Sequence, residues 1–322
     1  MKIIFLLLLL LLLFLLLPQG DGLLAPKLRT ISRDTLRVSS TGSSSSSTPP
    51  PGEHVRQELH AIHDGGVPRT VWQLDTKAWL KGDIDLELPE HFNIITSLPD
   101  ISELDSRRRK SPEWYEAWFI ETVRELLSVL PPRNVAIFYQ TPGRDSGVGG
   151  GWLDKGHLCH LGAAQAGAKC VWKKVVITQQ PGTRRGGRPG FVDMLCFSKE
   201  HRLPSPQTGQ EKRQKAFKTA DVILRGRMPH TKAFGTDACR EAVEYCATWV
   251  DGAIGGGDDD GDDRGLTTSS ATRLRPPAAA VVDPFCGRGS VLAAANAFAG
   301  APAFGMDISA GCCQISIDFA EL

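Results

Sequence analysis

The chain has 322 residues, of which 41% are hydrophobic, and its formal net charge at pH 7 is +1. This length suits one large domain or two small ones, and the apolar content is sufficient for a sizeable core. The balanced charge excludes a strong global field for nucleic acid, although an acidic run at 258–263 offsets basic clusters elsewhere. The eight cysteines form no CxxC pair and are too sparse for a disulfide scaffold, so we expect reduced thiols.

The N-terminus is typical of a targeting device. An apolar run follows Lys2 and ends at Leu17, as in a secretory signal peptide, and it is too short to span a bilayer comfortably. The next stretch is rich in Ser and Thr and poor in acids, which is typical of a transit peptide. We therefore expect a signal peptide at 1–20 and a transit-like segment at 21–52, with no stable membrane association after processing. This two-part address resembles that of proteins sent to plastids inside the secretory system; plain secretion is the alternative.

A single folded domain is expected over 53–322, interrupted by a disordered acidic linker at 252–277. Apolar runs and turn residues predict strands at 71–75, 92–96 and 135–139 and helices at 111–130, 153–166 and 238–250. His157 and His160 are spaced i, i+3 but lack an accompanying carboxylate, so we predict no metal site.

Two further strands, 170–178 and 191–198, are expected to pair as a late hairpin. The loop between them is basic, which suits contacts to phosphate groups, although a solubilising hairpin tip would have the same composition. The candidate phosphate-binding residues are Arg184, Arg185 and Arg188.

The C-terminal region predicts a strand at 278–282, a tight glycine turn, a helix at 291–299 capped by Ser290, and a strand at 303–306 that ends in Asp307. Free backbone N–H groups at the helix start would face a polar or anionic ligand. No Gly-Lys-Ser/Thr follows the glycines, which excludes a P-loop, and Leu292 departs from the dinucleotide fingerprint. Asp307 lies about 20 residues beyond the glycines, where nucleotide-type folds bind ribose hydroxyls.

The glycine turn resembles motif I of S-adenosylmethionine-dependent amino-methyltransferases of the N4-cytosine/N6-adenine type, Asp-Pro-Phe-x-Gly-Ser-Gly-Thr. The sequence matches this pattern at five positions and has Arg288 in place of the family's Ser. The resemblance implies S-adenosyl-L-methionine as the cofactor, with Asp307 on its ribose. It implies further cofactor contacts from Asp283, Pro284, Phe285, Cys286, Gly287, Gly289 and Ser290.

The stretch Lys81–Asp100 resembles the family's segment from a Gly-Asp pair, here with Asp83 at the cofactor, to the catalytic loop called motif IV. Ser97 and Pro99 match that loop, whereas Asp100 replaces the aromatic residue that stacks on the base. The resemblance implies that Ser97, Pro99 and Asp100 orient the acceptor amine. Asp100 cannot stack, and would act as a general base or bind a polar or cationic substrate. Alternatively, Ser97 and Asp100 only cap the next segment.

In this sequence the catalytic loop precedes the cofactor motif, which is a circular permutation of the usual order. The resemblance implies one Rossmann-like α/β domain, with a mostly parallel sheet, helices on both faces and an antiparallel edge hairpin. It implies methylation of an exocyclic amine of a nucleic-acid base. The small insert after the hairpin favours RNA or single-stranded DNA over duplex DNA as partner. The alternatives are a methyltransferase for a small molecule or protein, and an inactive binding protein of this fold. The oligomeric state is left open.

Overall fold

The computed structural model describes residues 57–63, 66–104, 111–144, 151–183, 189–200, 220–230, 233–254 and 279–319. The predicted signal peptide and transit-like segment lie outside these ranges, as does the predicted linker beyond Ile254. All described residues belong to one compact unit of the chain, Val38–Leu322. Within the described ranges, every helix is too short or too polar to cross a membrane.

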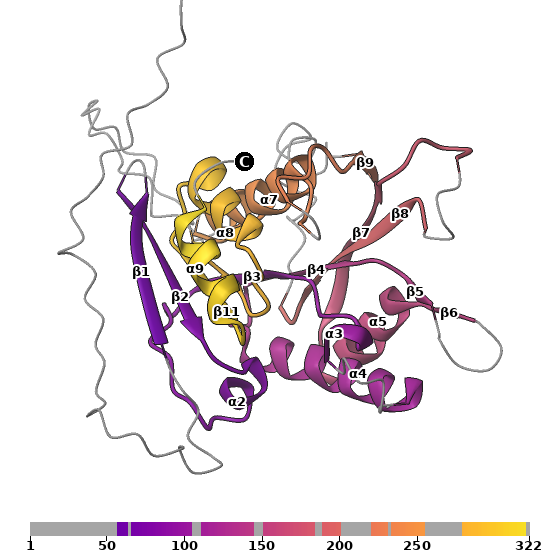
Figure 1. The fold of residues 1–322 in the computed structure, drawn as a ribbon, viewed down its shortest axis with the longest axis horizontal. Helices are drawn as coiled ribbons and strands as arrows, with labels where there is room; N and C mark the ends of the chain where they lie inside the picture. The colour runs from indigo at the N-terminus through magenta and orange to yellow at the C-terminus, as the bar shows by residue number, and fades with distance from the viewer. Residues whose placement is uncertain are drawn as a thin grey trace, which may run out of the picture. The chain divides into compact units, whose positions relative to one another are not determined.

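The core of the fold is a nine-stranded sheet with the order β1-β2-β11-β10-β3-β4-β8-β7-β9 (Figure 1). Five neighbouring strands, β2, β11, β10, β3 and β4, run parallel to one another. The predicted hairpin is formed by β7 and β8, and β8 lies antiparallel to β4. The strands are β1 Gln57–His63, β2 Val67–Gln73, β3 Phe92–Thr96, β4 Ala136–Gln140, β7 Lys169–Ile177, β8 Phe191–Ser198, β9 Val222–Leu224, β10 Ala280–Asp283 and β11 Ala303–Asp307.

Helices cover both faces of this sheet, which confirms the predicted fold class. Helices α7, α8 and α9 lie on one face, and α2, α4 and α5 lie on the other (Figure 1). A two-stranded ribbon, β5 Gly143–Arg144 with β6 Trp152–Leu153, precedes α5. The helices are α2 Thr76–Leu80, α3 Ile101–Leu104, α4 Pro112–Val129, α5 Lys155–Gln165, α7 Thr236–Ile254, α8 Ser290–Ala294, its π-helical continuation η2 Ala295–Ala299, and α9 Ala310–Asp318.

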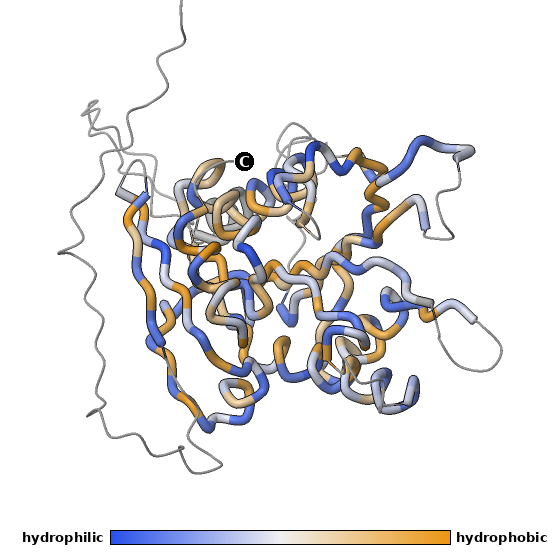
Figure 2. Tube along the Cα trace, in the orientation of Figure 1, coloured by the Kyte–Doolittle hydropathy of each residue, from blue (hydrophilic) through white to orange (hydrophobic). Residues whose placement is uncertain are grey.

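The hydrophobic core consists of two layers, because successive side chains of a strand point to opposite faces. Ile95 belongs to the layer beneath α7 and α8, whereas its neighbour Ile94 packs in the layer with α4 and α5. Both residues are fully buried. Figure 2 shows hydrophobic residues running along the central strands β3 and β4, as expected for parallel strands that are covered on both faces.

Helix α4 begins as the sequence predicts. Ser111 caps it, since its Oγ accepts a hydrogen bond from the backbone N–H of Trp114 at 3.2 Å, and a proline occupies the first turn. The buried face differs from the prediction, because Trp114 and Trp118 are only half-buried while Phe119 lies in the core. The Trp118 ring instead contacts Phe285 edge-on, with centroids 6.3 Å apart. Part of this helix therefore faces the glycine turn.

Candidate functional site

The carboxyl ends of the five parallel strands lie along one edge of the sheet. The strand order reverses at β10, which has β11 on one side and β3 on the other. Open α/β sheets bind their ligands in the crevice at such a switch point, outside the carboxyl ends of the strands. In this chain, the residues that end the strands there are Thr96, Asp283 and Asp307.

The glycine turn connects β10 to α8 at this point. Gly287 has a φ of 52° and Gly289 has a φ of 81°, and both values lie in the left-handed region that favours glycine. A Cβ on Gly289 would lie 2.3 Å from Ser316 Oγ, so close packing against α9 requires glycine there. A Cβ on Gly287 would meet no atom within 4 Å. Gly287 therefore faces open space into which a ligand can approach the backbone.

Ser290 does not have the role that the sequence predicts. Gly289 occupies the N-cap position of α8, where no side chain caps the helix, and Ser290 is the first helical residue. The prediction of a serine cap is therefore wrong. The reason is that Gly289, in the left-handed conformation, takes the N-cap position. The helix therefore begins at Ser290, one residue earlier than predicted, and the Ser290 side chain is buried.

Asp307 ends β11 beside the glycine turn, as predicted. Its Oδ2 accepts a hydrogen bond from the backbone N–H of Gly287 at 3.1 Å, and its Oδ1 accepts one from Ser309 N at 2.7 Å. Burial raises the pKa of Asp307, while these two backbone donors lower it. The carboxylate thus fixes the position of the turn, and its role on a ribose stays a prediction.

Asp283 joins the glycine turn to the predicted catalytic loop. Its Oδ1 accepts a hydrogen bond from Thr96 Oγ1 at 2.7 Å and one from Phe285 N at 3.2 Å. Thr96 directly precedes Ser97 and is 187 residues from Asp283 in the chain. Burial raises the pKa of Asp283 to about 7, although the two hydrogen bonds lower it. The two motifs that the sequence suggested therefore lie side by side.

A residue just after β2 that the sequence did not predict, Thr76, also contacts the glycine turn. Thr76 Oγ1 donates a hydrogen bond to the carbonyl oxygen of Pro284. Its neighbour Asp75 caps α2, because its Oδ1 accepts a hydrogen bond from the backbone N–H of Lys77 at 2.9 Å. Both residues follow closely after a strand that pairs with β11. An acid placed at the end of an apolar strand was the signal that could have identified them.

The predicted cofactor residue Asp83 is not part of this cluster of contacts. Asp83 is exposed and lies beyond the C-terminal end of α2, whereas Thr76 lies at the N-terminal end. The backbone N–H of Asp83 closes the last turn of that helix on Ala78 O at 3.0 Å. The Gly-Asp pair that contains Asp83 thus forms a turn, with a φ of 79° at Gly82.

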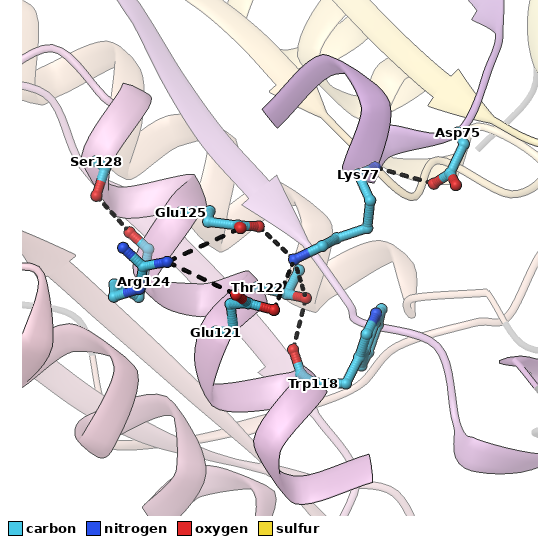
Figure 3. A network of polar contacts seen from close by, with 8 residues as sticks. All are labelled: Asp75, Lys77, Trp118, Glu121, Thr122, Arg124, Glu125 and Ser128. Atoms are coloured by element: carbon cyan, nitrogen blue, oxygen red, sulfur yellow. Dashed lines mark hydrogen bonds and ion pairs between the residues drawn. The ribbon is translucent and has the colours of Figure 1, made fainter. Parts of the chain in front are cut away.

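Helix α2 is held against α4 by the polar network in Figure 3. Lys77 Nζ forms ion pairs with Glu125 and, at 3.5 Å, with Glu121. Thr122 Oγ1 donates a hydrogen bond to the carbonyl oxygen of Trp118 at 2.7 Å. These contacts fix the start of α2 relative to α4. The start of α2 carries Thr76, whose hydroxyl group contacts the glycine turn.

The predicted catalytic loop follows β3 directly. Ser97 and Pro99 are half-buried, and Leu98 is buried in the layer beneath α4. Tyr115 Oη donates a hydrogen bond to the carbonyl oxygen of Pro99 at 2.9 Å. Asp100 is exposed and forms an ion pair with Lys155 on α5. Leu98 thus serves as an apolar anchor for the loop.

Gln140 is a second polar residue at this edge, at the carboxyl end of β4. It is buried, and neither its amide nitrogen nor its amide oxygen has a hydrogen-bond partner among the described residues. Buried polar groups are nearly always hydrogen-bonded, so an orphaned amide requires an explanation. A planar amide presents a donor and an acceptor side by side, a pair that a ligand with the complementary edge can satisfy.

The predicted phosphate-binding residues Arg184, Arg185 and Arg188 lie outside the described residues. The flanking ends of the hairpin are described. Asp193 on β8 pairs with Gln140, so the strands of the hairpin turn at the same edge as the glycine turn. No group of three or more His, Cys, Asp or Glu residues within the described ranges could hold a metal ion; a metal-free site stays a prediction.

No protein-family model and no curated protein sequence matches the chain. The chain is similar to solved DNA methyltransferases. One is a protein of Thermus thermophilus that carries the name putative DNA modification methylase, in complex with S-adenosyl-L-methionine: identity is 14%, 75% of this chain and 88% of that chain are covered, and the TM-score is 0.47. The cytosine-N4-specific PvuII DNA methyltransferase has 14% identity, covering 79% and 86%, with a TM-score of 0.49. The complex of M1.HpyAVI with SAM has 11% identity, with 79% of this chain and 100% of that chain covered and a TM-score of 0.45. At such identities the likeness concerns the fold alone.

Proposed function

We propose that the chain is an S-adenosyl-L-methionine-dependent methyltransferase that modifies an exocyclic amine of an unpaired nucleic-acid base, in RNA rather than in duplex DNA. One observation carries the proposal. The glycine turn and the Ser97–Asp100 loop start side by side, because Asp283, which precedes the turn, is hydrogen-bonded to Thr96, which precedes the loop. A donor site and an acceptor site that share one crevice are what group transfer between two substrates requires.

The residues of the glycine turn fit this cofactor. The open side of Gly287 leaves the backbone accessible to a bulky ligand, and a Cβ there would occupy that space. Asp283 and Asp307 place two acidic groups at the turn, which suits a ligand with a positive charge and hydroxyl groups. S-adenosyl-L-methionine bound there would supply a methyl group activated by a sulfonium.

The loop after β3 would orient the acceptor. Ser97 is half-buried at the end of β3, where its hydroxyl oxygen can accept a hydrogen bond from an acceptor amine. Asp100 offers a carboxylate on the exposed side of the same loop. Two acceptors that bind the N–H groups of one amine leave its lone pair directed away from them. Orientation is the main requirement, since a good leaving group needs little further activation.

The proposed acceptor class rests on hydrogen-bonding complementarity. An amino group beside a ring nitrogen, as in adenine or cytosine, presents a donor next to an acceptor. The amide of Gln140 at the same edge has the complementary pair of groups; both amide atoms are buried in this structure, so a base would reach them only after the side chains that cover them move. A base inside a duplex cannot reach a buried amide without leaving the stack, and an unpaired base has less stacking and pairing energy to lose.

The test is transfer from labelled S-adenosyl-L-methionine to a cell extract divided into RNA, DNA, protein and metabolites. We expect the RNA fraction to take up label. The Ser97→Ala variant should reduce the rate constant about 100-fold, the scale of a lost orienting group, while leaving cofactor affinity within about twofold. Ser128→Ala is the matched control, because this exposed hydroxyl on α4 only binds Arg124 O within its own helix.

The outcome separates the proposal from its alternatives. Label in the protein or metabolite fraction would refute the nucleic-acid acceptor and retain methyl transfer. Cofactor binding without label in any fraction would favour an inactive binding protein. Equal rates for the Ser97→Ala variant and the parent protein would remove Ser97 from the catalytic assignment.

A further inference from the structure

Lys155 is buried in an unusual position for a lysine. It is the first residue of α5 and its side chain is only 3% exposed. The N-terminus of a helix carries partial positive charge, so a cation there is disfavoured, and burial removes its hydration as well. The carboxylate of Asp100, which contacts Lys155 Nζ through Oδ1, compensates for both effects.

The surroundings of Lys155 restrict its side chain to this contact. Its ammonium group lies 5.8 Å from the centre of the Tyr115 ring, within the range of a cation–π interaction. Its stem passes along β5, where a Cβ built on Gly143 would be 3.5 Å from Lys155 Cε. Tyr115 in turn binds the carbonyl oxygen of Pro99 at 2.9 Å. The loop is therefore attached at two successive residues, Pro99 and Asp100.

Asp100 itself faces outward. Its side chain is 60% exposed, although its partner is almost fully buried. Its backbone N–H donates a hydrogen bond to Glu103 Oε2 at 2.8 Å, which adds a third attachment. Within the described part of the chain, no residue donates a hydrogen bond to Asp100 Oδ2. Within these residues Lys155 therefore binds Oδ1 alone, and the side chain that carries both oxygens is largely exposed.

We propose that Lys155 is a positioning residue that fixes the Asp100 carboxylate so that Oδ2 accepts a hydrogen bond from the N–H of the acceptor amine. This inference rests on the proposed function and specifies its acceptor. The substrate is recognised at this point by an N–H donor, and not by stacking on a ring. Tyr115 supports the loop through Pro99 and does not touch the acceptor. An acceptor whose amine carries no N–H is then not bound productively.

The kinetic test is a double-mutant cycle with Lys155→Met and Asp100→Ala, assayed with labelled S-adenosyl-L-methionine and short unstructured RNA oligonucleotides of mixed sequence. Each single variant should lower kcat about 100-fold, as expected when a positioning contact is lost, with an unchanged Kd for the cofactor. The double variant should be no slower than Asp100→Ala alone, because Lys155 acts only through Asp100. Lys155→Arg retains the charge and should recover at least about a tenth of the parent rate.

A second cycle measures the pair without activity, by urea unfolding of the cofactor-free protein. The midpoint shifts of Lys155→Met and Asp100→Ala should be clearly non-additive, because either change alone leaves the other group without its partner. Lys199→Met is the control for the kinetic cycle. Lys199 binds Ser128 O near the opposite edge of the sheet, so this variant should leave kcat unchanged.

The outcomes distinguish this inference from the proposed function. Transfer by the parent protein, combined with additive losses in either cycle, overturns the positioning role and leaves the methyltransferase proposal standing. No transfer by the parent protein to any fraction, combined with coupled unfolding, overturns both proposals and reduces the pair to a structural contact.

Discussion

Asp283 gives the sharpest test of the site, because it is buried between the two motifs. Burial raises its pKa from 3.8 to about 7. The folded protein therefore holds one more proton than the unfolded chain between these two values. The contribution of Asp283 to the free energy of unfolding is fully present below about pH 4. It falls by about 1.4 kcal/mol per pH unit as the pH rises towards 7, and above pH 7 it is constant. The total loss on ionisation is about 4 kcal/mol.

The perturbation is Asp283→Asn, which retains an oxygen for Thr96 and Phe285 but cannot ionise. Unfolding by urea between pH 4 and pH 8 gives the free energy of unfolding of both proteins without cofactor. We expect the variant to gain about 4 kcal/mol relative to the parent across this range, because only the parent must bury a charge at high pH. The control is Asp318→Asn, at an exposed acid that accepts a hydrogen bond from Gln314. Its difference in free energy of unfolding from the parent should be the same at every pH. A pH-independent difference for Asp283→Asn would show that Asp283 ionises as it does in water, and would refute the reasoning.

The remaining predictions concern the glycine turn. Gly287→Ala should cost roughly 1–2 kcal/mol of stability from left-handed strain alone, but weaken cofactor binding at least tenfold by filling the open space. Gly289→Ala should destabilise more, because its Cβ would overlap Ser316; equal unfolding midpoints for the two variants would contradict the packing explanation. Thr76→Val should cost about 1 kcal/mol by removing the hydrogen bond to Pro284 O, and Thr76→Ser should not. Urea unfolding and cofactor titration measure all three effects.

The parts of the fold that the sequence predicts well are those with strong local signals. The strand Phe92–Thr96 is predicted with the bounds that the structure has, because its residues are apolar or β-branched almost throughout. Helix α4 is located by its serine cap and by the proline in its first turn. The hairpin of β7 and β8 also follows from local apolar runs.

The missed features depend on contacts that are distant in sequence. Helix α2 has only five residues, too few to show a periodic pattern, and Lys77 anchors it to a residue 48 positions away. The contact between Thr76 and the turn therefore gave no signal in the sequence, and the cofactor contact of Asp83, which the Gly-Asp pair suggested, stays a prediction. Lys155 gave no signal either, because its partner is 55 residues away and becomes visible only in three dimensions.

The strand order gives a physical reason why two segments from opposite ends of the folded region form one cluster of contacts. Strands β2 and β3 follow each other in the sequence but do not pair, because β11 and β10 lie between them. The edge that carries the glycine turn is therefore complete only when β10 and β11, from the end of the chain, lie between β2 and β3. Val281 pairs with Asn93, so this insertion closes a very long loop, although the entropy cost of closure rises only slowly with loop length. The hydrogen bond from Thr96 to Asp283 joins the carboxyl ends of the paired strands β3 and β10. A chain that ended before β10 would therefore lack both the glycine turn and Asp283, the hydrogen-bond partner of Thr96 at the start of the loop.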